Sequence, residues 1–435
     1  MSEHDPSLPS LTRPVTAARL AVLRQAEDAA GHCRQPIRLR GWQREHDPDT
    51  GEVIAAVDSS DQPCGYLLIP CGNRREQVCP PCSRLYKGDT YQVLIAGLRG
   101  GHGIPGTVAA HPAVFATLTA PSFGAVHRGA AKPGSHPPRC HPRRDRPVCE
   151  HGMPASCGQR HEDGDPLAGQ PLCGDCFDYP GAVLFNSAVP ALWDQTTHAI
   201  RRQLGEATGL SQRALRQQLC LSFGKVIEYQ RRGLVHVHAV IRIDGPGGAG
   251  DPAPPWASAS LLRAVVTDSV PGPAVTLPDP VKPGQLLTLA WGRQRDVRIV
   301  RRDIAGELDD HKVAAYVAKY AVKGTEQIGG IPVRIRNISD LDDWHVTPHV
   351  RRLITACWQL GHREEYQSLR LARWAHQLGY RGWFSTRSRR YSVTLGSRRD
   401  ERRRARTTWI REHHGLPAAP GVITAEWHYA GQAGA

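Results

Sequence analysis

The sequence predicts an α+β protein, and three observations lead to this fold class. Residues 219–244 form two apolar, β-branched segments around a short turn at 231–233, which is the pattern of an antiparallel hairpin. Residues 309–324 have apolar side chains at helical spacing, begin with two aspartates and end with a glycine, as a capped helix does. Residues 140–180 are rich in cysteine, histidine and proline. They show neither the alternation of a strand nor the spacing of a helix, so we expect a loop-like insertion there.

The composition of the chain limits the classes of partner and compartment that we expect for the protein. The chain has 435 residues, 40% of them hydrophobic, and a formal net charge of +14 at pH 7. Such a basic excess indicates a polyanionic partner, and nucleic acid is favoured over a membrane because no basic amphipathic anchor is evident. No apolar run can span a bilayer and the N-terminus lacks a signal-peptide pattern, so we expect a cytoplasmic protein without a membrane partner. In a reducing compartment the twelve cysteines favour metal binding over disulfides.

The order of the predicted elements suggests four segments. They are an N-terminal segment at 1–60 with one helical stretch at 15–31, a cysteine-rich zinc module plus helix at 61–110, an α+β domain at 111–330 with a zinc-binding insertion at 140–180, and a helical C-terminal region with an arginine-rich tail at 331–435. Within the third segment we expect a strand at 112–120 and a second hairpin at 286–300.

A His-x-His pair stands in the second strand of the predicted hairpin. His236 and His238 are two residues apart, so their imidazoles project from the same face of a strand. Glu228 lies across the turn and could supply a carboxylate to the same face, with Asp309 or Asp310 as rival third ligands. Two imidazoles and one carboxylate suit a divalent cation such as Mg²⁺ or Mn²⁺ that also binds substrate oxygens. The alternative is a half-buried strand face with satisfied histidines.

The helix predicted at 309–324 carries a second group of reactive side chains. Tyr316 and Tyr320 are four residues apart and share a face, and Lys319 and Lys323 follow each of them by three residues. A tyrosine can act as a nucleophile on phosphorus while a nearby lysine offsets charge in the transition state. Two tyrosines on one face would allow two successive phosphoryl transfers. The alternative is an aromatic stripe packed into the core.

Two cysteine clusters have spacings that suggest structural zinc. The first consists of Cys64, Cys71, Cys79 and Cys82, and the second of Cys149, Cys157, Cys173 and Cys176. Alternative ligands near the second cluster are Cys140, His141, His151 and His161. Cys33, Cys220 and Cys357 are isolated and are expected to be ordinary buried residues. Free cysteines in a reducing cytosol are the alternative for both clusters.

The tail at 380–406 combines arginines with aromatic residues. We expect Arg381, Arg387, Arg389 and Arg390 to contact DNA phosphates, with Tyr380, Trp383, Phe384 and Tyr391 available for base stacking. A solvated basic terminus is the alternative.

These motifs together resemble those of the HUH endonucleases. The segments Phe-Ala-Thr-Leu-Thr-Ala-Pro-Ser at 115–122, His-Val-His at 236–238 and Tyr-Val-Ala-Lys-Tyr at 316–320 occur in the order of that family. The last segment resembles its two-tyrosine branch. The cysteine segments and the stretch 379–392 resemble rolling-circle plasmid replication initiators of actinobacterial mobile elements. The chain departs from the family in the small Val237 between the histidines and in the long cysteine-rich insertion.

The resemblance implies a fold and a reaction. It implies that 111–330 is a HUH endonuclease domain with a ferredoxin-like or RRM-like antiparallel sheet, helices on one side and the His-x-His strand in the centre. It also implies cleavage of single-stranded DNA at a replication origin, a tyrosine joined to the 5′-phosphate, and a free 3′-hydroxyl left to prime synthesis. A host helicase and a host polymerase are the expected protein partners. Two other functions stay open: a transposase or relaxase with the same chemistry, and a zinc-containing DNA-binding regulator without catalysis.

Overall fold

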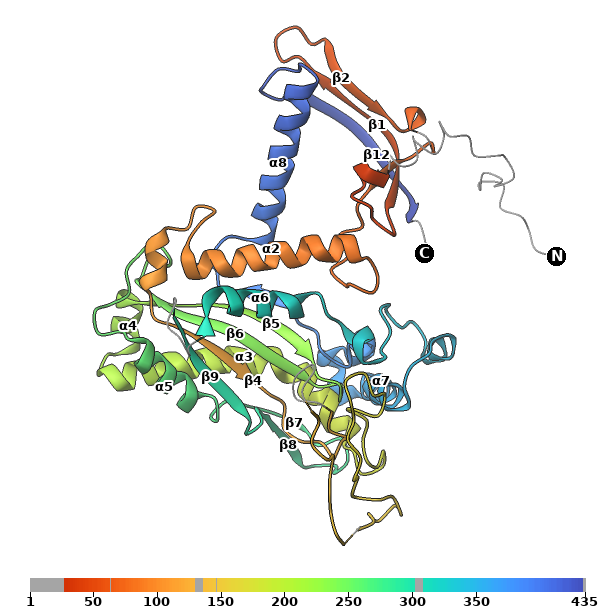
Figure 1. Cartoon of the computed structure of the whole chain (residues 1–435), viewed down its shortest axis with the longest axis vertical. Coiled ribbons are helices and arrows are strands. Elements are labelled where there is room, and N and C mark those ends of the chain that lie inside the picture. Colours follow the sequence, from red (N-terminus) through yellow and green to blue (C-terminus); the bar gives the residue numbers. More distant parts are fainter. Residues whose placement is uncertain (1–26, 63, 130–135, 146, 302–307, 433–435) are drawn as a thin grey trace, which may run out of the picture. The chain divides into compact units, whose positions relative to one another are not determined.

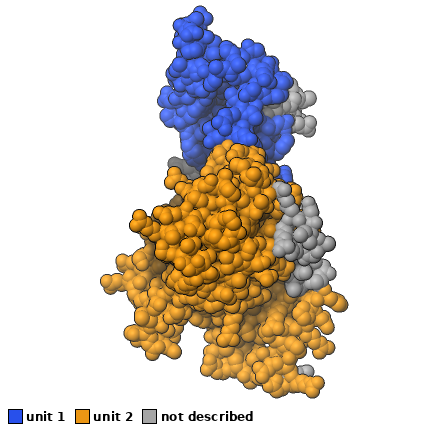
Figure 2. Space-filling view, turned by 90° about the vertical axis from the view of Figure 1, so that its left-hand side faces the viewer, with its two compact units in different colours: residues 1–86, 399–435 blue, residues 87–398 orange. Residues whose placement is uncertain are grey.

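The computed structural model describes residues 27–62, 64–129, 136–145, 147–301 and 308–432. The chain divides into two compact units (Figure 2): unit 1 comprises residues 1–86 and 399–435, and unit 2 comprises residues 87–398. Most of the helical stretch predicted at 15–31 lies outside the described residues. Among the residues that are described, no helix combines the length and the apolar character needed to cross a membrane.

Unit 1 is built on an antiparallel sheet that joins the two ends of the chain. Its strands are β1 (Ile37–His46), β2 (Val53–Asp58), β3 (Leu67–Ile69) and β12 (Val422–Gln432). β1 pairs with β2, β3 and β12. Helix α8 (Leu395–His413) contributes Arg411, whose buried guanidinium donates to the Glu45 carboxylate of β1 at 2.7 Å. The segments predicted separately at 1–60 and 331–435 therefore share one sheet, and the C-terminal region is not wholly helical.

Unit 2 contains a six-stranded sheet in the order β10-β9-β4-β6-β5-β11. Only the β10–β9 pair among these described strands is parallel, and the others are antiparallel. The strands are β4 (Ala113–Leu118), β5 (Cys220–Tyr229), β6 (Val235–Asp244), β9 (Arg295–Arg301), β10 (Leu308–Asp309) and β11 (Ser385–Arg387). The strand predicted at 112–120 and the hairpin predicted at 219–244 are confirmed as β4 and as β5–β6.

Helices cover both faces of this sheet (Figure 1). The helices with residues in unit 2 are α2 (Pro80–Arg99), α3 (Tyr179–Thr208), α4 (Gln212–Gln218), α5 (Ala259–Ser269), α6 (Asp310–Ala321), α7 (Pro348–Leu360) and the start of α8. α6 lies on one face, and α3 and α5 lie on the other. The expectation of helices on one side is therefore wrong. Nine of the ten residues of β6 are buried, so both faces of this strand are covered.

The prediction of a hairpin at 286–300 is also wrong. Its first half, β8 (Leu286–Ala290), pairs with β7 (Ala274–Pro278) in a separate two-stranded sheet, whereas β9 pairs with β4. Between them, the Gly292 N–H donates to the Thr119 carbonyl at 2.7 Å, and a Cβ at Gly292 would lie 2.5 Å from the Ala120 carbonyl oxygen. The glycine is required by this close approach of two backbones, and it does not form a hairpin turn.

The predicted helix signals are confirmed where they depend on local chemistry. Asp309 caps α6 by accepting from the His311 N–H at 2.7 Å, and Thr347 caps α7 with Pro348 in its first turn. α3 is one continuous helix that ends at Gly209, whose φ of +68° favours glycine.

Lys225 is a buried charge in β5. It faces the α3 side of the sheet, opposite to the His-x-His face, and its Nζ lies 5.6 Å from the Trp193 ring centroid. Burial lowers its pKa to about 8. The unfolded chain therefore holds this proton more tightly, so the penalty is complete below pH 8 and disappears as the pH rises towards 10.5.

We expect Lys225→Met to raise the free energy of unfolding at pH 7 by about 1–3 kcal/mol, because the cost of burying the ammonium is removed. The gain should shrink between about pH 8 and pH 10. Urea unfolding at several pH values measures it, with the exposed Lys282→Met as the matched control. A Lys225→Met variant less stable than wild type at pH 7 contradicts this account.

Candidate active site

The sheet register brings the predicted metal ligands onto one face. Glu228 in β5 stands opposite His236 in β6, and His238 stands between Val226 of β5 and Thr117 of β4. His238 Nε2 lies 2.8 Å from Glu228 Oε2, and His238 Nδ1 lies 3.1 Å from Thr117 Oγ1. Both imidazole nitrogens of His238 are therefore held by neighbours on the same face, which fixes the orientation of the ring.

Glu228, His236 and His238 form a group that could hold a metal ion. One ligand atom from each lies within 4.8 Å of the others. His236 Nε2 is buried without a hydrogen-bond partner, a costly arrangement unless the nitrogen binds something else. Burial, together with the charges of His238 and Arg232, lowers the pKa of His236 to about 3, so its imidazole is neutral as a ligand must be.

The two aspartates considered as rival third ligands are used elsewhere. Asp309 caps α6, as described above. Asp310 is buried, and Oδ2 of its carboxylate accepts from Arg99 Nε at 2.5 Å. The structure therefore groups Glu228, and neither aspartate, with the histidine pair.

The two tyrosines of α6 lie against His238. The Tyr320 ring stacks on His238 with centroids 5.2 Å apart, and the Tyr316 ring meets His238 edge-on at 5.4 Å. The two tyrosine rings are 4.8 Å apart, and Phe115 of β4 supports Tyr316 at 5.9 Å. Tyr316 and Tyr320 thus stand against the face that carries the candidate metal ligands.

Helix α2 fixes the start of α6 through residues within unit 2. Arg99 pairs with Asp310 at the first turn of α6, and the Tyr91 hydroxyl lies 2.6 Å from His311 Nδ1. These contacts join residues more than 200 positions apart, so they could not be found from local sequence.

The charges around the tyrosines differ in sign. Lys319 Nζ and Lys323 Nζ lie 5.9 Å and 4.9 Å from the Tyr320 ring centroid. Burial raises the pKa of both tyrosine hydroxyls, and the Glu228 carboxylate adds to the rise. A cation near these hydroxyls would therefore be needed to favour the phenolate. Tyr316 is 43% exposed, so it is open to a large substrate.

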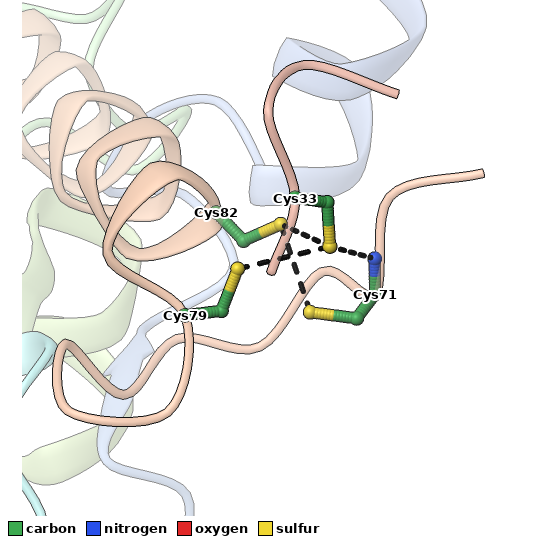
Figure 3. Close-up of side chains that lie close together, drawn as sticks. All are labelled: Cys33, Cys71, Cys79 and Cys82. Carbon is green, nitrogen blue, oxygen red and sulfur yellow. Dashed lines mark hydrogen bonds between the residues drawn. The ribbon is translucent and has the colours of Figure 1, made fainter. Parts of the chain in front are cut away.

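The cysteines of unit 1 form a group that differs by one member from the prediction. Cys33, Cys71, Cys79 and Cys82 point towards a common centre (Figure 3). The Sγ atom of Cys33 lies 3.7 Å from those of Cys79 and Cys82, and Cys71 Sγ lies 3.7 Å from Cys82 Sγ.

The expectation that Cys64 belongs to this group is wrong, because Cys64 is exposed and Cys33 takes its place. Pairing of Ile37 in β1 with Ile69 in β3 explains the exchange. It brings the residues just before β1 beside those just after β3, and so places Cys33 beside Cys71.

The cysteines of the insertion also group differently from the prediction. The structure separates them into two sets: His127, Cys140, Cys157 and His161; and Cys149, His151, Cys173 and Cys176. The single cluster expected from Cys149, Cys157, Cys173 and Cys176 is wrong in the placement of Cys157. The backbones of His141 and Cys157 exchange hydrogen bonds at 2.7 and 2.9 Å, which holds Cys157 beside Cys140.

The arginines predicted to bind DNA lie on the surface of unit 2. Arg381, Arg389 and Arg390 are exposed, and Arg387 is half-buried in β11. Of the interleaved aromatic residues, Tyr380, Phe384 and Tyr391 are buried in the core and only Trp383, at 82% exposure, is open to stack on a base. The prediction that all four aromatic residues are available to stack on bases is therefore wrong.

Residues 19–435 match the family model RepSA, described as "Replication initiator protein, pSAM2". The chain is also 40% identical over 440 residues to a replication initiator protein of Streptomyces ambofaciens, covering 97% of this chain and 91% of the relative. The chain therefore belongs to the pSAM2 replication initiator family. No solved structure matches it significantly.

Proposed function

We propose that this protein is a rolling-circle replication initiator that nicks one strand of its origin by tyrosine attack. The observation that carries the proposal is the placement of Tyr316 and Tyr320 within 5.4 Å, between ring centroids, of His238, on the face that holds Glu228 and His236. Membership of a replication initiator family supplies the biological setting. A core role alone accounts neither for the 43% exposure of Tyr316 nor for the buried, unpaired Nε2 of His236.

A divalent cation, Mg²⁺ or Mn²⁺, fits the group of Glu228, His236 and His238. One carboxylate oxygen and two imidazole nitrogens suit Mn²⁺ or a similar borderline ion, and positions left open can take phosphate oxygens. When bound, the ion would polarise the scissile phosphate and favour the phenolate form of a nearby tyrosine. Thr117 orients His238 from the other ring nitrogen, as outer partners of metal-binding histidines commonly do.

The proposed reaction exchanges one phosphate ester for another. The tyrosine oxygen forms a bond to phosphorus, the bond from phosphorus to the 3′-oxygen of the preceding nucleotide breaks, and the 5′-phosphate remains on the tyrosine. The phenol proton passes to water, and the departing 3′-oxygen takes up a proton to become a hydroxyl. Lys319 and Lys323 offset the added negative charge. No net energy source is needed, since one ester replaces another.

Tyr316 is the better candidate for the first attack. It is exposed, whereas Tyr320 is half-buried between the His238 ring and Lys323. Tyr320 would then act in the second transfer, which rejoins the displaced strand. The free 3′-hydroxyl left by the first step would prime a host polymerase, and a host helicase would separate the strands.

A cavity of about 740 Å³ beside the ends of β4 and β5 suggests where flanking DNA binds. Its lining includes Arg128, Arg231, Arg232 and Arg293. The Arg231 guanidinium pairs with Asp163 at 2.7 Å. The Arg232 guanidinium donates to the Ala120 and Pro121 carbonyls at 3.0 and 2.9 Å. A cavity lined by several guanidinium groups next to a strand-nicking site suits phosphates of the substrate.

We expect Arg293→Ala to weaken binding of a single-stranded origin oligonucleotide by about 10-fold at low salt and to lower the salt dependence by about one phosphate contact. Fluorescence anisotropy over a series of salt concentrations measures both. Arg202→Ala, an exposed arginine on α3 at the opposite face, is the control for charge loss. Equal effects of the two substitutions contradict a role for the cavity.

The test of the proposed reaction is a nicking assay. Purified full-length protein and labelled single-stranded oligonucleotides that tile the origin are incubated with Mn²⁺ or Mg²⁺, and with EDTA. We expect one cleavage position, a 3′-hydroxyl end and no cleavage in EDTA. Sequence-specific binding without cleavage on any tile would instead favour a non-catalytic regulator.

We further propose that the four cysteines of unit 1 hold a structural zinc ion. Their Sγ separations of 3.7 Å match the ~3.8 Å edge of a tetrahedron with Zn–S bonds of about 2.3 Å. Cys33, Cys79 and Cys82 are buried with Ala30 and form the small core around this point. A metal would thus add stability to a part of unit 1 where this described core is small.

We expect Cys33→Ser to lose one zinc ion per chain and to unfold unit 1, because structural zinc contributes roughly 10 kcal/mol or more to small domains. The exposed Cys64→Ser should keep full zinc content and stability. Elemental analysis and limited proteolysis of both variants measure the difference. Loss of zinc from Cys64→Ser with none lost from Cys33→Ser would reverse the assignment.

A further inference from the structure

We propose that the insertion between β4 and α3 is a cross-braced module that holds two further zinc ions. The first site consists of His127, Cys140, Cys157 and His161, and the second of Cys149, His151, Cys173 and Cys176. These residues are separate from the proposed nicking group, so the inference stands independently of the reaction. It replaces the single zinc site that the cysteine spacing suggested.

The ligands alternate along the chain in four pairs. The first pair, His127 and Cys140, and the third pair, Cys157 and His161, belong to one site. The second pair, Cys149 and His151, and the fourth pair at 173 and 176 belong to the other. Each ion would therefore close a loop that contains a ligand pair of the other ion. Loss of one ion would therefore release a loop that carries ligands of the other ion. We call this interleaved arrangement a cross-brace.

The distances between ligand atoms fit tetrahedral zinc. Zn–S bonds of about 2.3 Å and Zn–N bonds of about 2.05 Å give edges of roughly 3.5 Å for sulfur to nitrogen and ~3.3 Å for nitrogen to nitrogen.

In the first site, His161 Nε2 lies 3.1 Å from His127 Nδ1 and 3.5 Å from Cys157 Sγ, and Cys140 Sγ lies 3.8 Å from His127 Nδ1. In the second site, His151 Nδ1 lies 3.3, 3.8 and 4.0 Å from the sulfurs of Cys176, Cys173 and Cys149. Each residue directs one ligand atom to a shared centre.

The surroundings of the first site support a built metal centre. Cys140 and His161 have no exposed surface. The other ring nitrogen of His161 lies 2.8 Å from Asp165 Oδ2, the carboxylate partner that commonly orients a zinc-binding histidine. The Arg128 N–H donates to Cys140 Sγ at 3.2 Å, which stabilises a thiolate. Residues that bound no metal would not need both a carboxylate partner for the histidine and an N–H donor to the cysteine sulfur.

The insertion has little regular secondary structure to stabilise it. Between β4 and α3, the described residues contain isolated bridges but no helix or strand (Figure 1). It contacts the β5–β6 turn, where Arg231 pairs with Asp163 at 2.7 Å. A Cβ at Gly169, whose φ is +92°, would lie 2.5 Å from Arg231 Cβ, so the module backbone packs directly on the turn. The two ions would thus also position the turn that follows Glu228.

Zinc content of the full-length protein tests the module. With the unit 1 site filled, we expect three zinc ions per chain by elemental analysis and native mass spectrometry. One site has four cysteines, one has two cysteines and two histidines, and one has three cysteines and one histidine. X-ray absorption should therefore give an average of three sulfur ligands and one imidazole nitrogen ligand per zinc. In a Cys33→Ser background the insertion alone should retain two ions, which separates failure of the unit 1 site from failure of the module.

Two variants test the ligand assignment. Cys140→Ser should lose at least one zinc ion, and both ions of the module if the cross-brace is cooperative. His141→Ala, beside it but outside both sites, should lose none. If Cys140→Ser is recovered only as aggregate, His161→Cys decides: it should keep all zinc with a higher share of sulfur ligands. Full zinc content in Cys140→Ser, or an unchanged ligand ratio in His161→Cys, would overturn the module.

Discussion

The double variant Tyr316→Phe, Tyr320→Phe is expected to form no covalent adduct with origin DNA and to nick at least about 10³-fold more slowly than wild type. The reason is that both hydroxyls able to reach the phosphate over the His-x-His face are removed, while the rings that pack on His238 and Phe115 remain. Adduct formation on a labelled oligonucleotide, resolved by denaturing electrophoresis, measures the loss. Origin binding should change little.

The single variants show which tyrosine acts first. Tyr316→Phe should slow the first cleavage far more than Tyr320→Phe does, because Tyr316 is the exposed ring. Tyr320→Phe should cleave but fail to rejoin strands. Tyr429→Phe, an exposed tyrosine of unit 1, is the matched control and should behave as wild type. Wild-type nicking by the double variant would remove both tyrosines from the reaction.

Replacing His236 with alanine is expected to lower nicking by at least about 100-fold at saturating Mn²⁺. His236 Nε2 has no hydrogen-bond partner within the described protein, so the substitution breaks no hydrogen bond of that atom and should spare the fold. Isothermal titration with Mn²⁺ should show loss of the tight site in parallel with activity.

Two controls separate metal loss from structural damage. His198→Ala removes an exposed histidine from α3, on the other side of the sheet, and should leave nicking and Mn²⁺ binding intact. Circular dichroism and thermal unfolding should be similar for His236→Ala and wild type. Full activity of His236→Ala would show that the buried imidazole serves only the core.

The parts of the site that follow from local sequence were predictable. The two strands around 231–233 form a hairpin because the turn is short and the flanks are β-branched, and that hairpin alone places Glu228 opposite His236. The capping aspartate and the four-residue spacing likewise fix Tyr316 and Tyr320 on one face of α6.

Long-range pairing determined what the sequence could not reveal. Cys33 reaches its partners because β1 pairs with β3, and His127 reaches Cys140 and His161 through a fold without periodic elements. Spacing rules detect ligands that are close in sequence, so they grouped Cys64 and Cys157 with the nearest Cys-x-x-Cys pairs. Helices on both faces, and the burial of Tyr380 and Tyr391, also depend on packing between distant segments.

The most direct test of the central claim is the chemical identity of the protein–DNA linkage. Wild-type protein is allowed to cleave an origin oligonucleotide, digested with protease and nuclease, and examined by tandem mass spectrometry. We predict a nucleotide joined through its 5′-phosphate to Tyr316 or Tyr320, with a free 3′-hydroxyl on the other fragment. A linkage through a 3′-phosphate or to any other residue, or cleavage without a covalent linkage, would contradict the account.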